Sequence, residues 1–226
     1  MHLMRVPTWC KFVSKLEEIF AKLEHTLSEK DSVRDSIQET ARSIIRLSKT
    51  VLGLIHRGLL EEAKLEADKF SSLLVNLEKL RSLHEEFYFS NLIADAYQEY
   101  CEARVLLTYL SESRIPNWEE LRSPPISYLL GLLDMVGELR RLTLDCIRRG
   151  DIDAAERFLK TMDDIYYESM KIDSPYALSV GLRRKLDIAR KIIETTRGDL
   201  IFEIRRSKLE QALRNLEDVI RRHEAS

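Results

Sequence analysis

The chain has 226 residues, a net charge of −2 at pH 7 and a pI of about 6.3. This near-neutral balance excludes a global field that attracts nucleic acid or an anionic membrane, so a polyanionic partner requires a local basic patch. No apolar run approaches the roughly 20 residues that a membrane-spanning helix needs. The three cysteines have no metal-type spacing and argue against a disulfide framework, so we expect reduced thiols in a cytoplasmic protein.

Long helices with few turns are predicted along the chain, because it contains only seven glycines and five prolines. The hydrophobic period predicts helices over approximately 7–27, 31–57, 60–83, 85–111, 126–150, 151–170 and 175–222. Polar residues 28–31 predict a break, Gly150 a helix end and Ser174 a helix cap, while Gly198 is a candidate interruption. No strand-like alternation appears. We therefore expect an all-α fold, with residues 1–226 forming a single-domain bundle of about seven helices.

A basic stripe runs along the helix predicted over 31–57. Its members recur mostly every three or four residues, which places them on one side of a helix; they are Arg34, Gln38, Arg42, Arg46, Lys49 and Arg57. A charge run of this kind is most often a solvated helix face. The functional alternative is contact with the phosphates of a nucleic acid through Arg42, Arg46, Lys49 and Arg57.

Two pairs of carboxylates stand at helical spacing on two predicted helices. Glu99 and Glu102 are three residues apart and share a face with apolar Leu106. Asp134 and Glu138 are four residues apart in the most apolar helix of the chain. A buried carboxylate loses much of its hydration energy unless a positive group meets it. If the two helices face each other, the four side chains supply the oxygen ligands that Mg²⁺, Mn²⁺ or Ca²⁺ prefers.

The same acids are also compatible with roles that involve no metal ion. A Glu-x-x-Glu pair occurs by chance on many helices, where it usually faces solvent. Asp134 and Glu138 could instead form ion pairs with Arg104, Arg140 or Arg141. The five histidines are scattered and predict no histidine-based cluster, and no glycine-rich phosphate loop occurs. This leaves the carboxylates as candidates for catalysis, and a phosphodiester substrate would link them to the basic stripe.

Three segments follow one another in a specific order. They are Gln98-Glu99-Tyr100-Cys101-Glu102-Ala103, then Tyr128-Leu129-Leu130-Gly131 with Asp134 and Gly137-Glu138-Leu139, and then Gly150-Asp151-Ile152-Asp153. Together they resemble the translin superfamily and, within it, the branch of translin-associated factor X (Trax). Three shorter segments also match in order and approximate spacing, namely Ser48-Lys49, His56-Arg57 and Ser174-Pro175-Tyr176. The resemblance is strongest over about 31–204, and the compact chain is similar to archaeal-type members.

The resemblance implies an all-helical, magnesium-dependent endoribonuclease with an acidic active site. Carried over residue by residue, the Trax acids, which are catalytic groups and ligands of Mg²⁺ or alternatively Mn²⁺, correspond to Glu99, Glu102, Asp134 and Glu138. It also implies a closed, roughly octameric homo-oligomer that handles nucleic acid inside. The chain departs from the family ahead of the first acids, where the basic, histidine-rich segment is here Phe87-Tyr88-Phe89-Ser90-Asn91, without positive charge.

Two functions of different kinds are therefore expected as alternatives. The preferred one is a Mg²⁺-dependent endoribonuclease that cleaves single-stranded RNA with a metal-activated water. The second is a non-catalytic oligomeric scaffold that binds single-stranded RNA or DNA, as translin does. Neither function involves a membrane. The four acids favour the nuclease, because a scaffold has no evident need for them.

Overall fold

The computed structural model describes residues 8–83 and 91–224. In these residues every regular element is an α-helix, as the sequence predicted. The helices are α1 (Thr8–His56), α2 (Leu60–Ala67), α3 (Phe70–Leu83), α4 (Asn91–Glu112), α5 (Pro125–Arg149), α6 (Ile152–Met170), α7 (Pro175–Ser179) and α8 (Leu182–Glu224). None of these helices has the combination of length and apolar character that crossing a lipid bilayer requires.

The first two predicted helices are one continuous helix, so the predicted break at 28–31 is wrong. These residues are polar, but neither glycine nor proline occurs among them, and an exposed helix tolerates polar residues that place no constraint on the backbone. Nearby hydroxyl groups are satisfied within the helix. Thr26 Oγ1 donates to Lys22 O at 3.0 Å, and Ser36 Oγ donates to Ser32 O at 2.9 Å.

Two further boundaries differ from the prediction. The segment 60–83 forms two helices, because the chain turns at Asp68 and the Ser71 hydroxyl donates to Asp68 O at 2.6 Å. The C-terminal region divides at Gly181, whose φ of 100° is a left-handed conformation that residues with a side chain rarely adopt. Gly198, in contrast, lies inside α8 and does not interrupt it, since glycine lowers helix stability without forcing a helix to end.

The helix ends predicted at Gly150 and Ser174 are confirmed. Gly150 has a φ of 78° and closes α5 in a left-handed conformation. The Asp151 side chain then accepts a hydrogen bond from Ala154 N at 3.0 Å, and the Ser174 side chain accepts one from Ala177 N at 3.3 Å. These caps satisfy backbone donors at the starts of α6 and α7.

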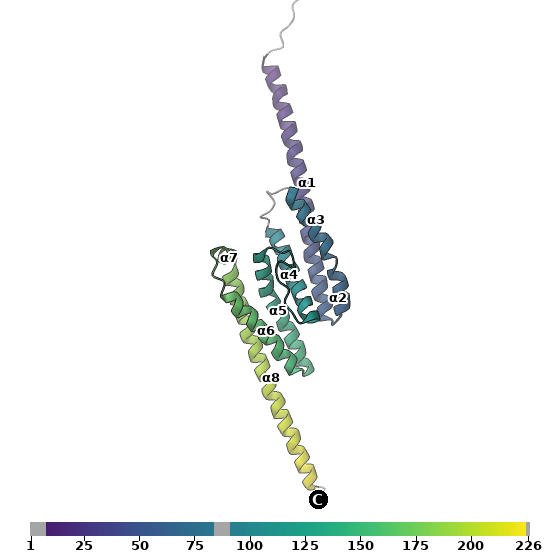
Figure 1. Ribbon diagram of the computed structural model, residues 1–226, viewed down its shortest axis with the longest axis vertical. Helices are drawn as coiled ribbons and strands as arrows, with labels where there is room; N and C mark the ends of the chain where they lie inside the picture. Colours follow the sequence, from purple (N-terminus) through teal and green to yellow (C-terminus); the bar gives the residue numbers. More distant parts are fainter. Residues whose placement is uncertain (1–7, 84–90, 225–226) are drawn as a thin grey trace, which may run out of the picture.

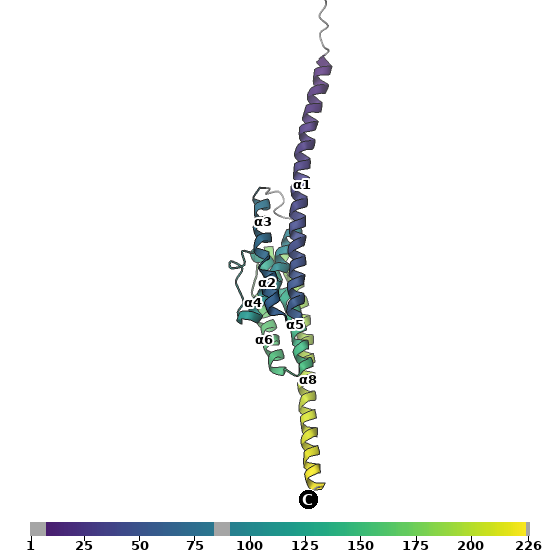
Figure 2. The same cartoon turned by 90° about the vertical axis from the view of Figure 1, so that its right-hand side faces the viewer.

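Helices α4 and α5 form the centre of the fold. α4 packs against α1 and α5, and α5 packs in turn against α6 and α8, while α2 and α3 lie against α1. Figures 1 and 2 show an elongated molecule in which the N-terminal part of α1 projects from one end and the C-terminal part of α8 from the other. The bundle therefore surrounds α4 and α5, and two helical arms extend beyond it.

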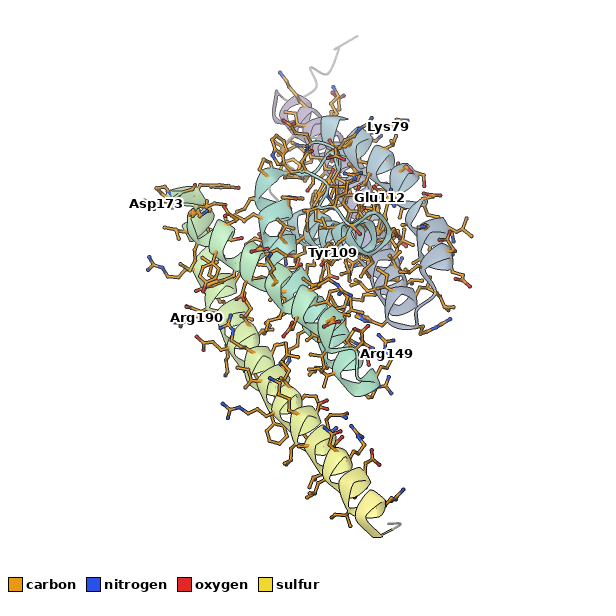
Figure 3. The ribbon with its side chains drawn as sticks, turned by 60° about the horizontal axis from the view of Figure 1, so that its bottom comes forward. Lys79, Tyr109, Glu112, Arg149, Asp173 and Arg190 are labelled. Carbon is orange, nitrogen blue, oxygen red and sulfur yellow. The ribbon has the colours of Figure 1, made fainter. Side chains whose placement is uncertain are left out.

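Both arms carry exposed apolar side chains. Those of α1 are Leu16, Ile19, Phe20, Leu23 and Leu27, and those of α8 are Phe202, Leu209, Leu213, Leu216 and Ile220. In Figure 3 the side chains along the distal part of α8 project outward, whereas Tyr109 lies within the bundle, where its hydroxyl is 2.8 Å from Thr161 Oγ1. Contiguous exposed apolar residues are typical of surfaces that contact another protein.

The two central helices approach closely at Gly131. A Cβ atom added to this glycine would lie 2.7 Å from Gln98 O, 2.9 Å from Cys101 Cβ and 3.2 Å from Glu102 N. Protein interiors are close-packed, so atoms at these distances would have to shift. Only a residue without a side chain permits this approach. As a result, the face of α4 that carries Glu102 lies directly beside the face of α5 that carries Asp134.

We expect Gly131→Ala to lower the free energy of unfolding by about 1–3 kcal/mol, because the added methyl group would overlap Gln98 O and force α4 and α5 apart. Gly137→Ala on the same helix is the matched control, since a Cβ atom there would meet nothing within 4 Å. The control should raise the free energy of unfolding by roughly 0.5–1 kcal/mol through helix propensity. Urea unfolding of both variants measures the difference, and equal effects would contradict the steric role of Gly131.

Candidate functional site

The four predicted acids gather where α4 and α5 cross. Glu99 and Glu102 lie one turn apart on α4, and Asp134 and Glu138 lie one turn apart on α5. Glu102 is only 8% exposed, and its carboxyl group lies close enough to the other three acids to interact with their charges. The close approach at Gly131 thus unites two acidic helix faces that are far apart in the sequence.

Burial and mutual proximity raise the pKa values of two of the four acids. Burial, followed by the negative charges of the other three acids, raises the pKa of Glu102 to about 8, against the opposing charge of Lys185. Burial also raises the pKa of Glu99, while the nearby Lys49 opposes that rise and Asp134 adds to it. The ionised form is disfavoured because few positive groups compensate carboxylates that are partly removed from water. Near neutral pH, the free protein therefore keeps Glu102 largely protonated.

Asp134 is held by two side chains on different helices. Gln98 Nε2 on α4 donates to Asp134 Oδ2 at 2.5 Å, and Lys185 Nζ on α8 donates to Asp134 Oδ1. The side chains of Lys185 and Asp134 are 28% and 26% exposed, so water reaches the ion pair only in part. Both carboxylate oxygens of Asp134 thus have protein partners.

Glu138 is contacted by a histidine of α1. His56 Nε2 forms a hydrogen bond with Glu138 Oε2, and the His56 side chain is only 3% exposed. The other ring nitrogen, Nδ1, is buried and has no hydrogen-bond partner among the described residues. The carboxylate of Glu138 and the imidazole therefore orient each other where α1 meets α5.

Helical spacing predicted the two acidic pairs, but no sequence pattern predicted the groups that pair with them. Within the described ranges, none of the three arginines considered as partners forms an ion pair with these acids, and Arg140 Nη2 instead contacts Asp199 at 3.0 Å. The partners are Lys185 and His56. The resemblance had included His56-Arg57, which was the one available signal for the histidine. Nothing local distinguishes Lys185 from the other basic residues of α8.

The predicted basic stripe lies on α1. Arg42 and Arg46 are exposed and form hydrogen bonds with neighbours on the same helix. Lys49 is exposed too, and it is near enough to Glu99 for its charge to lower the pKa of that carboxyl group. Arg57 follows the end of α1 and is exposed. The stripe therefore ends beside the acids.

A groove adjoins the acids on the side of α7 and the start of α8. It has a volume of about 1780 Å³ and is lined mainly by apolar and aromatic side chains, including the exposed Trp118 and Tyr176. Gln98 and Lys185, which hold Asp134, also line it, so the groove leads to the acids. Of the uncharged segment 87–91, only Asn91, the first residue of α4, belongs to the described residues.

The donor chemistry of the cluster suits a hard divalent cation, because carboxylate oxygens are the ligands that Mg²⁺ and Mn²⁺ prefer. The raised pKa of Glu102 indicates that the cluster lacks positive charge, which such an ion would supply. As the side chains stand, no three His, Cys, Asp or Glu residues in 8–83 and 91–224 are arranged to hold an ion. Asp134 and Glu138 are both engaged by protein partners, Lys185 and His56, with which an ion would compete.

Glu102 predicts a pH-dependent stability. Its pKa in the folded protein, about 8, exceeds the ordinary value of 4.5, so the folded state binds more protons than the unfolded state between these values. The free energy of unfolding should therefore fall as the pH rises from about 5 to about 8, by at most ~1.4 kcal/mol per pH unit, and then level off. Thermal melts in the presence of a chelator measure this slope. Glu102→Gln should remove most of it, and an unchanged slope in that variant would assign it to another group.

Comparisons with known proteins agree with this architecture. The model of the Translin family matches residues 32–195. AfC3PO, in the structure of its complex with duplex RNA, is 35% identical with a TM-score of 0.72, and the match covers 84% of this chain and 96% of that chain. An uncharacterized protein of Methanocaldococcus jannaschii is 32% identical over 210 residues, which are 92% of this chain and 93% of that protein.

A more distant relative is translin-associated protein X of Mus musculus. It is 27% identical over 172 residues, which cover 74% of this chain and 56% of that protein. The family match spans the bundle from α1 to α8, and the archaeal relative extends over nearly the whole chain. The chain therefore belongs to the Translin family.

Proposed function

We propose that this protein is a metal-dependent endoribonuclease that cleaves single-stranded RNA. Glu99, Glu102, Asp134 and Glu138 would hold Mg²⁺, for which Mn²⁺ could substitute. The observation that carries the proposal is the burial of Glu102, 8% exposed, among three further carboxylates. Such clustering of like charge is costly to folding, and active sites are where proteins retain it.

The residues around the acids support distinct roles. A divalent ion, when bound, activates a water molecule and neutralises charge on the phosphate. Glu102 would release its proton as the ion binds, because ligands must be ionised to bind a metal. His56 would hold the Glu138 carboxylate in a fixed orientation through its Nε2 contact. Gln98 would do the same for Asp134, since its amide donates to Oδ2 at 2.5 Å.

The basic stripe and the groove support RNA as the substrate. Arg42, Arg46 and Lys49 form an exposed row of cations that ends beside Glu99, and such a row can follow a phosphate backbone. The groove beside α7 and the start of α8 carries aromatic side chains, on which unpaired bases can stack. The similar AfC3PO has been crystallised with duplex RNA. Cleavage assays should therefore compare single-stranded with duplex RNA, and single-stranded DNA with both.

The second candidate function is a non-catalytic scaffold that binds single-stranded RNA or DNA. The exposed row of cations on α1 favours this function as much as it favours the nuclease. For either function we propose a homo-oligomer, with the octamer implied by the family resemblance. The exposed apolar residues of the two arms support such an assembly.

Asp134→Asn is expected to lower the RNA cleavage rate by at least about a hundredfold while changing RNA affinity little, because metal ligands act mainly on the chemical step. Asp145→Asn is the matched control on the same helix, since Asp145 contacts Arg148 at 3.3 Å instead of the acids. Labelled RNA, with and without Mg²⁺, reports cleavage, and a gel shift in the presence of a chelator reports affinity. Light scattering should show an unchanged assembly.

Wild-type protein that binds RNA but never cleaves it would favour the scaffold over the nuclease. Loss of RNA affinity or of assembly together with cleavage in Asp134→Asn would assign the acids a structural role. Retained cleavage in that variant would remove Asp134 from the site.

The basic stripe on α1 gives a separate prediction. Replacing Arg42, Arg46 and Lys49 together by Gln should weaken RNA binding and reduce the slope of log affinity against log salt by up to about 2, since each phosphate contact contributes about 0.7 on single strands. A control variant that neutralises Lys64, Lys69 and Lys171, whose side chains are 44%, 61% and 68% exposed, should keep the wild-type slope. An unchanged slope in the first variant would identify the row as an ordinary solvated helix face.

A further inference from the structure

Lys185 is the counter-ion of Asp134, and its charge also acts on two further acids of the cluster. Its ammonium group donates to Asp134 Oδ1, and its positive charge partly opposes the burial-driven rise in the pKa values of Glu99 and Glu102. It comes from α8, whereas the acids belong to α4 and α5. In the free protein, one lysine of α8 therefore contacts the acids of α4 and α5 through Asp134.

A divalent cation and this ammonium group compete for the same carboxylate. Gln98 already donates to Asp134 Oδ2, so Oδ1 is the oxygen that Lys185 and an ion would share. Two positive charges at one oxygen repel each other, and an ion of charge +2 attracts the four acids more strongly than an ammonium group does. Ion binding at Asp134 should therefore displace Lys185.

The surroundings of Lys185 allow its side chain to move while its helix stays fixed. Leu182 and Ala189 on the same helix are 0% and 1% exposed, which anchors this part of α8 in the bundle. The lysine side chain is a flexible four-carbon stem, is 28% exposed and lines the groove beside the acids. The ammonium group of Lys185 can therefore contact a phosphate group that binds in the groove.

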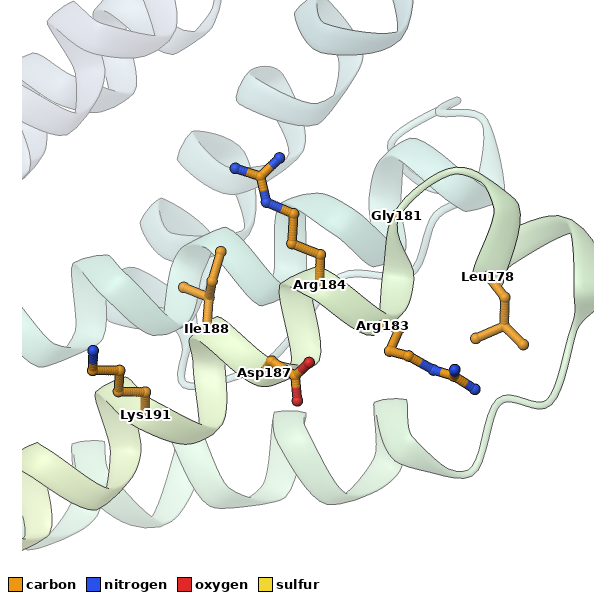
Figure 4. A pocket seen from close by; sticks show the side chains of 7 residues that line it. All are labelled: Leu178, Gly181, Arg183, Arg184, Asp187, Ile188 and Lys191. Atoms are coloured by element: carbon orange, nitrogen blue, oxygen red, sulfur yellow. The ribbon is translucent and has the colours of Figure 1, made fainter.

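Further cations surround the start of α8. Figure 4 shows Arg183 and Arg184 pointing to different sides of the helix, with Lys191 further along it. The N-terminal end of a helix also carries a partial positive charge. Arg184 lines the groove together with Lys185, whereas Arg183 does not. These two cations therefore present positive charge towards the groove, and Lys185 is the one that reaches the acids.

We propose that Lys185 is a catalytic residue that exchanges partners. In the free protein its ammonium group holds Asp134, and when a divalent ion binds there, the group moves to a non-bridging oxygen of the phosphodiester. The inference rests on the proposed nuclease function. In the second position the ammonium group stabilises the negative charge that develops on the phosphate oxygens during cleavage. The exchange links occupation of the acids by an ion to contact with the substrate.

Two substitutions at this position separate charge from structure. Lys185→Gln removes the charge but keeps a donor that can hydrogen-bond to Asp134. Lys185→Arg keeps the charge and can bind the carboxylate with two donors. The matched control is Arg183→Gln, which removes one positive charge from the same turn of α8 at an exposed residue. Thermal melts of all three variants verify that they fold.

The first measurement is calorimetric titration of the RNA-free protein with Mn²⁺. Lys185→Gln should bind Mn²⁺ at least about fivefold more tightly than the wild type, because its competitor is gone. Lys185→Arg should bind Mn²⁺ more weakly than the wild type, and Arg183→Gln should match it. The second measurement is cleavage of labelled RNA at saturating Mg²⁺, where Lys185→Gln should be about a hundredfold slower or worse, and Arg183→Gln should retain the wild-type rate.

Weaker Mn²⁺ binding by Lys185→Gln would overturn the proposal, because it would show that the lysine supports the shape of the site. Tighter binding with an unchanged cleavage rate would overturn the phosphate contact. A wild-type protein that cleaves no RNA would contradict the nuclease function and the catalytic role together. A cleaving wild type with an equally active Lys185→Gln would contradict the catalytic role of Lys185 alone.

Discussion

The close approach of α4 and α5 at Gly131 is the constraint on which the rest of the structure depends. A side chain there would meet Gln98 O at 2.7 Å, so the two helices lie nearer than larger residues would allow. The approach buries Glu102 beside the acids of α5 and raises its pKa to about 8. Removing carboxylates from water without full compensation costs stability. Apolar packing between the helices of the bundle must offset this loss of stability.

The negative charge of the acidic cluster is partly compensated by groups from several parts of the bundle. Lys185 comes from α8, His56 and Lys49 come from α1, and Gln98 comes from α4 itself. Each acid pair therefore depends on the packing of the outer helices against the central two. Because α1 also carries the exposed row of cations, movement of that helix would alter both the orientation of Glu138 and the proposed path of the RNA. Ion binding, RNA binding and assembly are expected to influence one another through these helices.

Local sequence features determined most of the helical architecture, but not every boundary. The hydrophobic period predicted the long helices, and Gly150 and Ser174 marked ends that the structure confirms. Polar residues at 28–31 did not end α1, because polarity alone leaves the helical backbone intact. Composition also did not distinguish Gly181, which separates α7 from α8 at a φ of 100°, from Gly198, which lies inside a helix. The backbone conformation of a glycine depends on how the flanking helices pack.

The sequence by itself determined which acids share a helix face, because spacings of three and four residues define a face wherever a helix forms. It thereby predicted both acidic pairs, Glu99 with Glu102 and Asp134 with Glu138. Only the tertiary structure decided that the pairs meet and that Lys185 forms an ion pair with Asp134. A counter-ion on a distant helix leaves no local pattern, since its position relative to the acids is set by the packing of α8 against α5.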